Sequence, residues 1–262
     1  MRASKLNLIP YGRQCISSLE IEEVVKVMKS DWITQGPKIE EFESALAQYC
    51  GSKYAVAVSS GTAALHLACL ATGLKKGDEA VTSPITFLAT SNAVVYSNAQ
   101  PKFADIQIKD GNIDPEKIKK ILTKKTKVLL PVCFSGFPTD IVKISKIAKK
   151  NHLTIIEDAC HALGAKYKVN GKWNSVGSCR HSDMTVFSFH PVKHITTGEG
   201  GAITTNSAHL YEKLKILRNH GIYRDIKMMK RQPWNYEMRE LGFNYRLTDF
   251  QCALGIAQLK RL

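Results

Sequence analysis

Apolar residues recur at intervals of three and four in the first fifty positions, which is the spacing of amphipathic helices. The first run follows an S-x-x-E capping box formed by Ser17 and Glu20, a signature of a helix N-terminus. The apolar positions of the two runs are Ile21, Val24, Val25 and Met28, and then Ile39, Phe42, Leu46 and Tyr49. The pattern predicts that two helices open the chain.

Beyond residue 50 the pattern changes to short apolar runs that favour β-strands. These runs span residues 54–58, 79–82, 102–106, 127–132, 153–158, 184–189 and 201–205. Helical patterns separate most of them: one begins at Asp114-Pro115, and another follows Thr139-Asp140. Such alternation is typical of a mainly parallel sheet covered on both faces. We therefore expect an α/β fold with three layers, α/β/α, whose ligands bind beyond the carboxyl ends of the strands.

No internal repeat, low-complexity tract or Pro/Gly/Ser linker interrupts the chain, so we expect one large domain over residues 1–262. A Thr248-Asp249 cap starts the last segment, whose apolar residues at helical spacing are Phe250, Ala253, Leu254 and Ala257. Neither glycine nor proline terminates this predicted helix before Leu262. We expect the chain to end inside a helix, as a fragment would.

The composition of the 262 residues, 44% apolar and 23% charged, excludes disordered chains and small disulfide scaffolds. The chain has no apolar run of membrane-spanning length, and its start lacks the apolar stretch of a secretory signal. We expect no membrane partner and a cytoplasmic location. The seven cysteines are scattered and contain no C-x-x-C pair, which argues against disulfides and a zinc site. We expect reduced cysteines and no bound metal.

The formal net charge of +14 suits phosphate-bearing partners of any size. Much of the excess lies on lysines spaced like the solvated side of amphipathic helices. These are Lys119, Lys120, Lys124, Lys125, Lys127, Lys143, Lys146, Lys149 and Lys150. No arginine-rich stripe or aromatic-interleaved basic strand accompanies them, so nucleic acid is not an expected partner.

A polar turn, Ser59-Ser60-Gly61-Thr62, joins the first predicted strand directly to a helix. Glycine lets the backbone approach a ligand, and the first-turn N–H groups together with the helix dipole favour a phosphate. Ser-Gly turns between a strand and a helix are also common without any ligand. The turn is therefore a candidate phosphate site that needs support from elsewhere in the chain.

Two further candidates follow other predicted strands. Asp158 closes the run 153–158 at the ligand-binding edge, where an anion needs a cation or a protonated ring nitrogen, although it also fits as a cap of the next turn. Lys193 follows the run 184–189 in a loop whose lysine has an ordinary interpretation as solvated surface. A phosphate cradle, a carboxylate and an amine at one edge are what pyridoxal phosphate requires.

Longer motifs surround these residues. They are the segments 59–62, 86–87, 157–164, 187–193, 198–201, 218–221 and 242–247, with sequences SSGT, TF, EDACHALG, FSFHPVK, GEGG, RNHG and GFNYRL. Together they resemble the DegT-type sugar aminotransferases, which are fold-type I pyridoxal-phosphate enzymes, and the resemblance spans nearly the whole chain. The stretches 82–87, 110–114, 189–197 and 234–242 are most similar to the members that aminate C4 in pseudaminic acid synthesis.

The resemblance implies an enzyme that transfers an amino group from glutamate to C4 of a UDP-linked 4-keto-6-deoxy-N-acetyl-hexose. It implies that Lys193 anchors the cofactor covalently and moves protons, and that Asp158 pairs with the ring nitrogen. The other implied cofactor contacts are Phe87 stacking on the ring, His161 near its hydroxyl, Gly61, Thr62 and Ser188 at the phosphate, and Asn244 reaching the partner subunit's cofactor. We therefore expect a homodimer with shared active sites.

The same resemblance places Thr34, His190, His220, Tyr245 and Arg246 around the sugar nucleotide. An arginine offers the fork geometry that suits a diphosphate or carboxylate. His161 has an alternative role as a structural histidine, and Tyr245 and Arg246 have one in dimer packing. Family members continue into a small C-terminal domain that covers the cofactor cleft, and we expect that domain to be absent here.

Other interpretations remain open. Sugar dehydratases of the same fold carry histidine in place of the lysine, and His194 directly follows Lys193. A different nucleotide-sugar aminotransferase, or a non-catalytic remnant that binds cofactor, fits the same motifs.

Overall fold

A seven-stranded sheet forms the centre of the computed structural model, which describes residues 11–223 and 234–262. The strand order is β1-β9-β8-β5-β4-β2-β3, and β9 alone runs against its neighbours. The strands are β1 (Tyr54–Val58), β2 (Glu79–Thr82), β3 (Gln100–Phe103), β4 (Thr126–Leu130), β5 (Thr154–Asp158), β8 (Met184–Ser188) and β9 (Gly201–Thr205). The expected mainly parallel α/β fold is confirmed.

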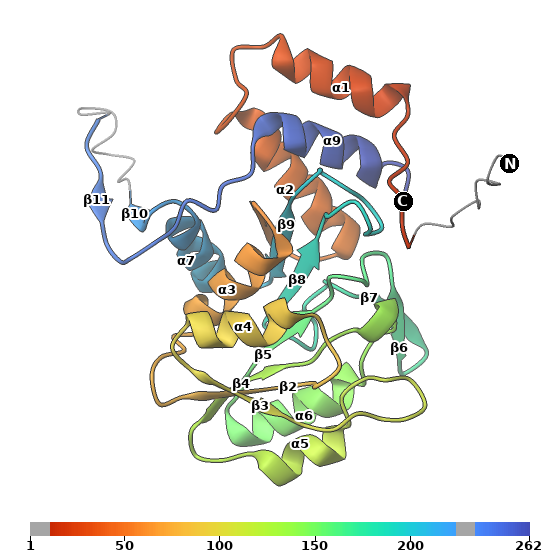
Figure 1. Cartoon of the computed structure of the whole chain (residues 1–262), viewed down its shortest axis with the longest axis vertical. Helices are drawn as coiled ribbons and strands as arrows, with labels where there is room; N and C mark the ends of the chain where they lie inside the picture. The colour runs from red at the N-terminus through yellow and green to blue at the C-terminus, as the bar shows by residue number, and fades with distance from the viewer. Residues whose placement is uncertain (1–10, 224–233) are drawn as a thin grey trace, which may run out of the picture.

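Helices cover both faces of this sheet (Figure 1). They are α1 (Ser18–Met28), α2 (Pro37–Cys50), α3 (Gly61–Ala71), α4 (Leu88–Tyr96), α5 (Pro115–Ile121), α6 (Ile141–Asn151), α7 (Ala208–Arg218) and α9 (Asp249–Leu259). Helices α3, α4 and α7 share a core with one face of the sheet. On the other face, α2 and α9 cover one half and α5 and α6 the other, while α1 packs outside α9.

Side-chain alternation along the strands divides the core between these layers. Val128 and Leu130 of β4 face the α3 and α4 layer, whereas Leu129 between them faces α5 and α6. In β5, Ile156 and Ile155 divide in the same way. Strands buried on both sides are rich in apolar residues on both faces, which is why their sequences show little polar alternation.

The predicted helix starts are confirmed by their caps. Ser17 and Glu20 form the capping box of α1, and Thr248 forms another with Gln251 at α9. The side chain of Asp114 accepts a hydrogen bond from the backbone of Glu116 at the start of α5, and Asp140 caps α6.

Several predicted boundaries are wrong by a few residues. The run 102–106 forms a strand over Gln100–Phe103, because β3 pairs with β2 and the chain then turns away, leaving Ile106 in an isolated bridge with Ile113. The run 127–132 forms a strand that stops at Leu130, since Pro131 has no N–H to donate. In α9 the most deeply buried side is centred on Cys252 and Ile256, with Phe250 and Leu254 only half-buried.

The hydrophobic pattern did not predict two short antiparallel strand pairs outside the central sheet. A hairpin joins β6 (Lys166–Val169) and β7 (Lys172–Ser175) through Asn170-Gly171, both with positive φ. An Asn-Gly turn is a strong hairpin signal. The flanking residues are mostly polar, so the hydrophobic pattern alone did not predict these strands. A short pair, β10 (Ile222–Tyr223) and β11 (Glu237–Met238), lies near the edge of the molecule.

Each of the seven cysteines is unpaired, and five of them are buried. Among the residues that the structure describes, no helix is long and apolar enough to cross a membrane, and no cluster of His, Cys, Asp and Glu could hold a metal.

Candidate active site

The carboxyl ends of three strands meet at one cavity of about 590 Å³. Val58 at the end of β1 and Ser188 at the end of β8 both pair with Gly201, the first residue of β9. Asp158 at the end of β5 pairs with Val186 of β8, so it lies beside them. The predicted site residues that line this cavity are Gly61, Thr62, Phe87, Asp158, His161, Ser188, His190 and Lys193.

The cavity floor includes the first turn of α3. Ser60 caps this helix, accepting hydrogen bonds from the backbone N–H of Ala63 on its Oγ and of Ala64 on its carbonyl. The amides of Gly61 and Thr62 stand in the first turn, where N–H groups have no partner within the helix. A Cβ at Gly61 would lie 2.8 Å from Ser188 Cβ, so only glycine lets β8 approach the turn this closely. These donors and the helix dipole suit a phosphate.

The Asp158 carboxylate is 5% exposed and held by neutral donors. Thr90 Oγ1 of α4 donates to Oδ2 at 2.7 Å, and the Cys160 backbone N–H donates to Oδ1 at 3.2 Å. A carboxylate has about four acceptor positions, so these two bonds leave capacity for a cationic N–H donor from a ligand.

Lys193 is half-buried at the same cavity. Burial lowers the pKa of its amine from the usual range, and nearby Cys160 and Asp158 oppose that shift. A lowered pKa increases the fraction of neutral amine, which is the form that attacks a carbonyl and accepts a proton.

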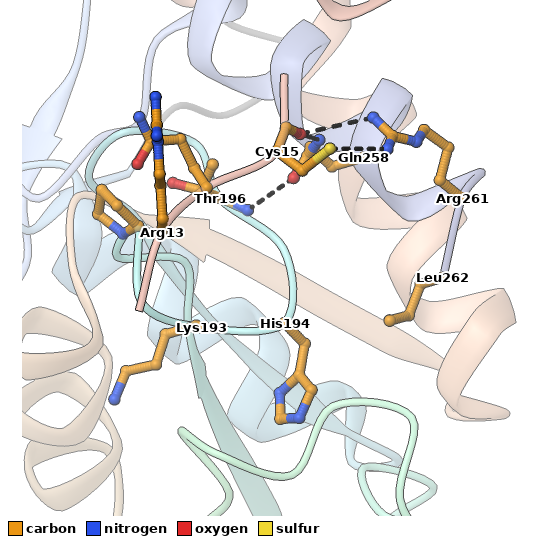
Figure 2. A pocket seen from close by; sticks show the side chains of 10 residues that line it. Arg13, Cys15, Lys193, His194, Thr196, Gln258, Arg261 and Leu262 are labelled. Atoms are coloured by element: carbon orange, nitrogen blue, oxygen red, sulfur yellow. Dashed lines mark hydrogen bonds between the residues drawn. The ribbon is translucent and has the colours of Figure 1, made fainter. Parts of the chain in front are cut away.

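His194 faces elsewhere. It lines a separate cavity of about 170 Å³ with Arg13, Cys15, Gln258 and Arg261, and it is not among the residues around Asp158. Figure 2 shows the Lys193 and His194 side chains diverging from the shared loop. Lys193 lines both cavities, so Lys193 alone of the two residues reaches the carboxylate side.

Two aromatic residues and an imidazole complete the wall. Phe87 precedes α4 and leaves 74% of its surface exposed, a large apolar area available to cover a flat ring. Burial and the nearby Lys193 lower the pKa of His161, which favours the neutral imidazole. Phe134, on the short 3₁₀ turn Phe134–Gly136, also lines the cavity.

The remaining predicted residues do not line this cavity within the chain. Arg246 Nη1 donates to Asn219 Oδ1 at 2.7 Å, and the Tyr245 hydroxyl lies 3.2 Å from His66 Nδ1. Asn244 is exposed and bridges to Asn219. Two further predicted residues also lie outside the cavity. His220 is exposed and has a positive φ, and Thr34 forms an isolated β-bridge with Thr248.

Several cavity residues were not singled out from the sequence. Tyr11, Thr86, Thr90, Ser135 and Glu199 all contribute to the wall. Thr90 lies in the first turn of α4 and Thr86 just before this helix, but nothing local predicts that their hydroxyls lead to Asp158. Tyr11 and Ser135 offer no comparable sequence pattern.

The geometry can hold a molecule that has a phosphate, a protonated ring nitrogen and a carbonyl group. Residues 14–262 match the family model described as the DegT/DnrJ/EryC1/StrS aminotransferase family. The chain belongs to this family. A Campylobacter jejuni relative, the UDP-4-amino-4,6-dideoxy-N-acetyl-beta-L-altrosamine transaminase, is 45% identical over 97% of this chain, and the match spans 65% of that relative.

Solved structures of family-like proteins share the fold. Helicobacter pylori PseC, an aminotransferase involved in pseudoaminic acid biosynthesis, superposes with a TM-score of 0.87 at 35% identity, covering 96% of this chain and 65% of PseC. The PLP-form of a putative sugar aminotransferase from Streptococcus pneumoniae has a TM-score of 0.87 at 31% identity, covering 97% of this chain and 66% of that one. The family expected from the motifs is confirmed.

Proposed function

We propose that the chain is the cofactor-binding part of a pyridoxal-phosphate-dependent aminotransferase that moves an amino group from glutamate to C4 of a UDP-linked 4-keto-6-deoxy-N-acetyl-hexose. The observation that carries this proposal is the single cavity shared by Lys193, Asp158 and the Gly61-Thr62 turn. Residues 62, 158 and 193 come from three separate elements, so their convergence is a property of the fold.

The donor set fits pyridoxal phosphate. The open amides of α3 and the Ser188 hydroxyl suit its phosphate, the Asp158 carboxylate suits a protonated ring nitrogen, and the Lys193 amine suits its carbonyl. When bound, this cofactor supplies an electron sink for the carbon that loses a proton. The exposed face of Phe87 offers apolar cover for a ring.

Residues of the chain itself would hold and move protons at the bound cofactor. Once freed from the cofactor, Lys193 Nζ, with its pKa lowered by burial, would accept a proton from the substrate carbon and deliver it to the cofactor. The Asp158 carboxylate stays fixed by Thr90 and Cys160 while it holds the ring-nitrogen proton in place. His161, favoured as the neutral imidazole, offers a hydrogen bond without adding charge.

The named sugar is supported by the altrosamine transaminase and PseC described above. An aminotransferase for another nucleotide sugar fits the same cavity. The divergence of Lys193 and His194 favours an aminotransferase over a dehydratase of this fold, because the amine and not the imidazole lies with Asp158. A homodimer with Asn244 reaching the partner's cofactor, a substrate site at Thr34, His190, His220, Tyr245 and Arg246, and a cytoplasmic location belong to the same proposal.

The decisive experiment compares Lys193→Ala with His194→Ala. Purified protein is mixed with pyridoxal phosphate and reduced with borohydride, and peptides are analysed by mass spectrometry. We expect a cofactor adduct on Lys193 in the wild type and in H194A, and none in K193A. Addition of glutamate and the UDP-linked 4-keto sugar should give amino-sugar product, with K193A slower by about 10²- to 10⁴-fold or more.

An adduct without product would support the non-catalytic remnant instead. Loss of the adduct in H194A but not in K193A would contradict the assignment of the anchoring amine.

A further inference from the structure

Two threonines at the cavity wall lead to the Asp158 carboxylate: Thr86 just before α4, and Thr90 in its first turn. Thr90 is fully buried, with 0% of its surface exposed, and its Oγ1 donates to Asp158 Oδ2 at 2.7 Å. Thr86 lines the cavity, and its Oγ1 lies 2.6 Å from Thr90 Oγ1. Thr86 precedes the N-cap residue Phe87, and the turn into α4 brings its hydroxyl to that of Thr90.

The direction of these hydrogen bonds follows from counting protons. A hydroxyl has one proton, and Thr90 uses it for the ionised carboxylate, which only accepts. Thr86 must therefore donate to Thr90, and the chain runs from the cavity wall through two hydroxyls to Asp158 Oδ2. Polarisation along such a chain strengthens the final bond in a buried setting.

The Cys160 thiol also lies within reach of Asp158 and is a weak donor, so Thr90 is the hydroxyl donor to this carboxylate. The backbone of Cys160 holds Oδ1, while Lys193 and His161 lie close enough to interact through charge. Glu157 and the Cys133 and Cys160 thiols are the remaining titratable neighbours, and burial raises the pKa of each of them. The strongest neutral donor to Oδ2 is the Thr90 hydroxyl, at 2.7 Å.

We propose that Thr90 is a positioning residue for the reaction, with Thr86 as the outer donor: together they hold the Asp158 carboxylate aimed at the ring nitrogen. This inference rests on the proposed function. Thr90 lines the cavity, but it is fully buried and its hydroxyl proton is donated to Asp158, so we do not expect it to contact the substrate directly. Its effect would pass entirely through Asp158.

The test compares Thr90→Val with Thr90→Ser. Valine has nearly the shape of threonine without the hydroxyl, whereas serine keeps the donor. A hydrogen bond to a charged group is worth enough that T90V should bind pyridoxal phosphate about 10- to 100-fold more weakly. The acid limb of cofactor binding, followed by the visible absorbance of bound cofactor, should move to higher pH by about one unit. T90S should stay within about threefold of the wild type.

Thr82→Val provides the matched control. Thr82 is also fully buried, but its hydroxyl donates to the Leu130 carbonyl at 2.8 Å and not to a carboxylate. This variant loses a comparable buried hydrogen bond, so it should lose stability without moving the pH limb. A Thr86→Val variant, which leaves the direct bond in place, should weaken cofactor binding by about threefold.

A double-mutant cycle separates positioning from general packing. In an Asp158→Asn background, Thr90→Val should cause no further loss of cofactor affinity, because its target has already changed. The inference would be overturned if cofactor binding by T90V and by the wild type had the same acid limb. It would also be overturned if Thr90→Val lowered cofactor affinity equally in the wild-type and Asp158→Asn backgrounds. If the wild type itself binds no pyridoxal phosphate, the proposed function fails first. If T90V does not fold, T86V decides: its acid limb should move in the same direction by a smaller amount, and an unchanged limb would overturn the inference.

Discussion

Asp158 and Glu157 are consecutive buried carboxylates in β5, and alternation sends them to opposite faces of the sheet. Asp158 meets the Thr90 hydroxyl and the Cys160 amide at a cavity that also contains Lys193. Glu157 meets the Cys133 thiol at 3.5 Å and the Thr185 hydroxyl at 3.3 Å, its partner residue across from β8. Among the described residues, no cation forms a salt bridge with it.

The difference shows that the surroundings of a buried carboxylate decide whether it can bind a ligand. Burial raises the pKa of Glu157 to about 7, because weak neutral donors do not compensate the lost hydration. Asp158 has better donors, an open side and a nearby amine, so it is arranged to receive a cationic ligand group. The face of the sheet, not the residue type, decides which carboxylate belongs to the site.

The largest expected contrast comes from neutralising each carboxylate in turn. Asp158→Asn removes the charge opposite the ring nitrogen and should lower turnover by about 10²- to 10³-fold. Glu157→Gln removes an equally buried carboxylate that does not touch the cavity, and it should change turnover by less than about twofold. Steady-state rates of both variants with glutamate and the keto sugar measure this, and similar losses in the two would remove the distinction.

The next contrast concerns stability against pH. The unfolded chain releases the Glu157 proton near 4.5, whereas the folded state retains it up to a pKa of about 7. The folded state therefore binds more protons in this window, and the unfolding free energy should fall by about 3 kcal/mol as pH rises from 4.5 to 7. Urea unfolding across this range checks the slope.

Glu157→Gln supplies the control for that slope, since an amide does not titrate. We expect the variant to lose the fall attributable to this residue and to be more stable than the wild type above pH 7. If the unfolding free energies of the wild type and the variant changed in parallel with pH, Glu157 would titrate near its ordinary range.

The smallest contrast concerns the donors of the two carboxylates. Thr185→Val removes one neutral donor from Glu157 and should destabilise the fold by about 1 kcal/mol, with cofactor binding unchanged. Thr90→Val, on the other face, should weaken cofactor binding as described above. Thermal unfolding and cofactor titration of the two variants test this together, and a loss of cofactor affinity in T185V would contradict the separation of the faces.

Much of the site was predictable because its anchors have local signals. Ser60-Gly61-Thr62, Asp158 and Lys193 each follow a strand, and the carboxyl edge of a parallel sheet collects such residues. Thr90 and Tyr11 were missed because their role depends on contacts with residues distant in sequence. Asn244, Tyr245 and Arg246 stay predictions, since the single chain places them with Asn219 and His66 and not at the cavity.

By itself the sequence determined most strands and helices of the central layers, to within a few residues at their ends, and the residues that cap several helices. These features depend on side-chain period and on short-range hydrogen bonds within a few residues. Only the tertiary structure decided that Lys193 and not His194 lies with Asp158, that Thr90 holds the carboxylate, and that Glu157 is sealed on the far face. Those outcomes depend on how separate elements pack across the sheet, and a one-residue change of position along a strand reverses the face that a side chain meets.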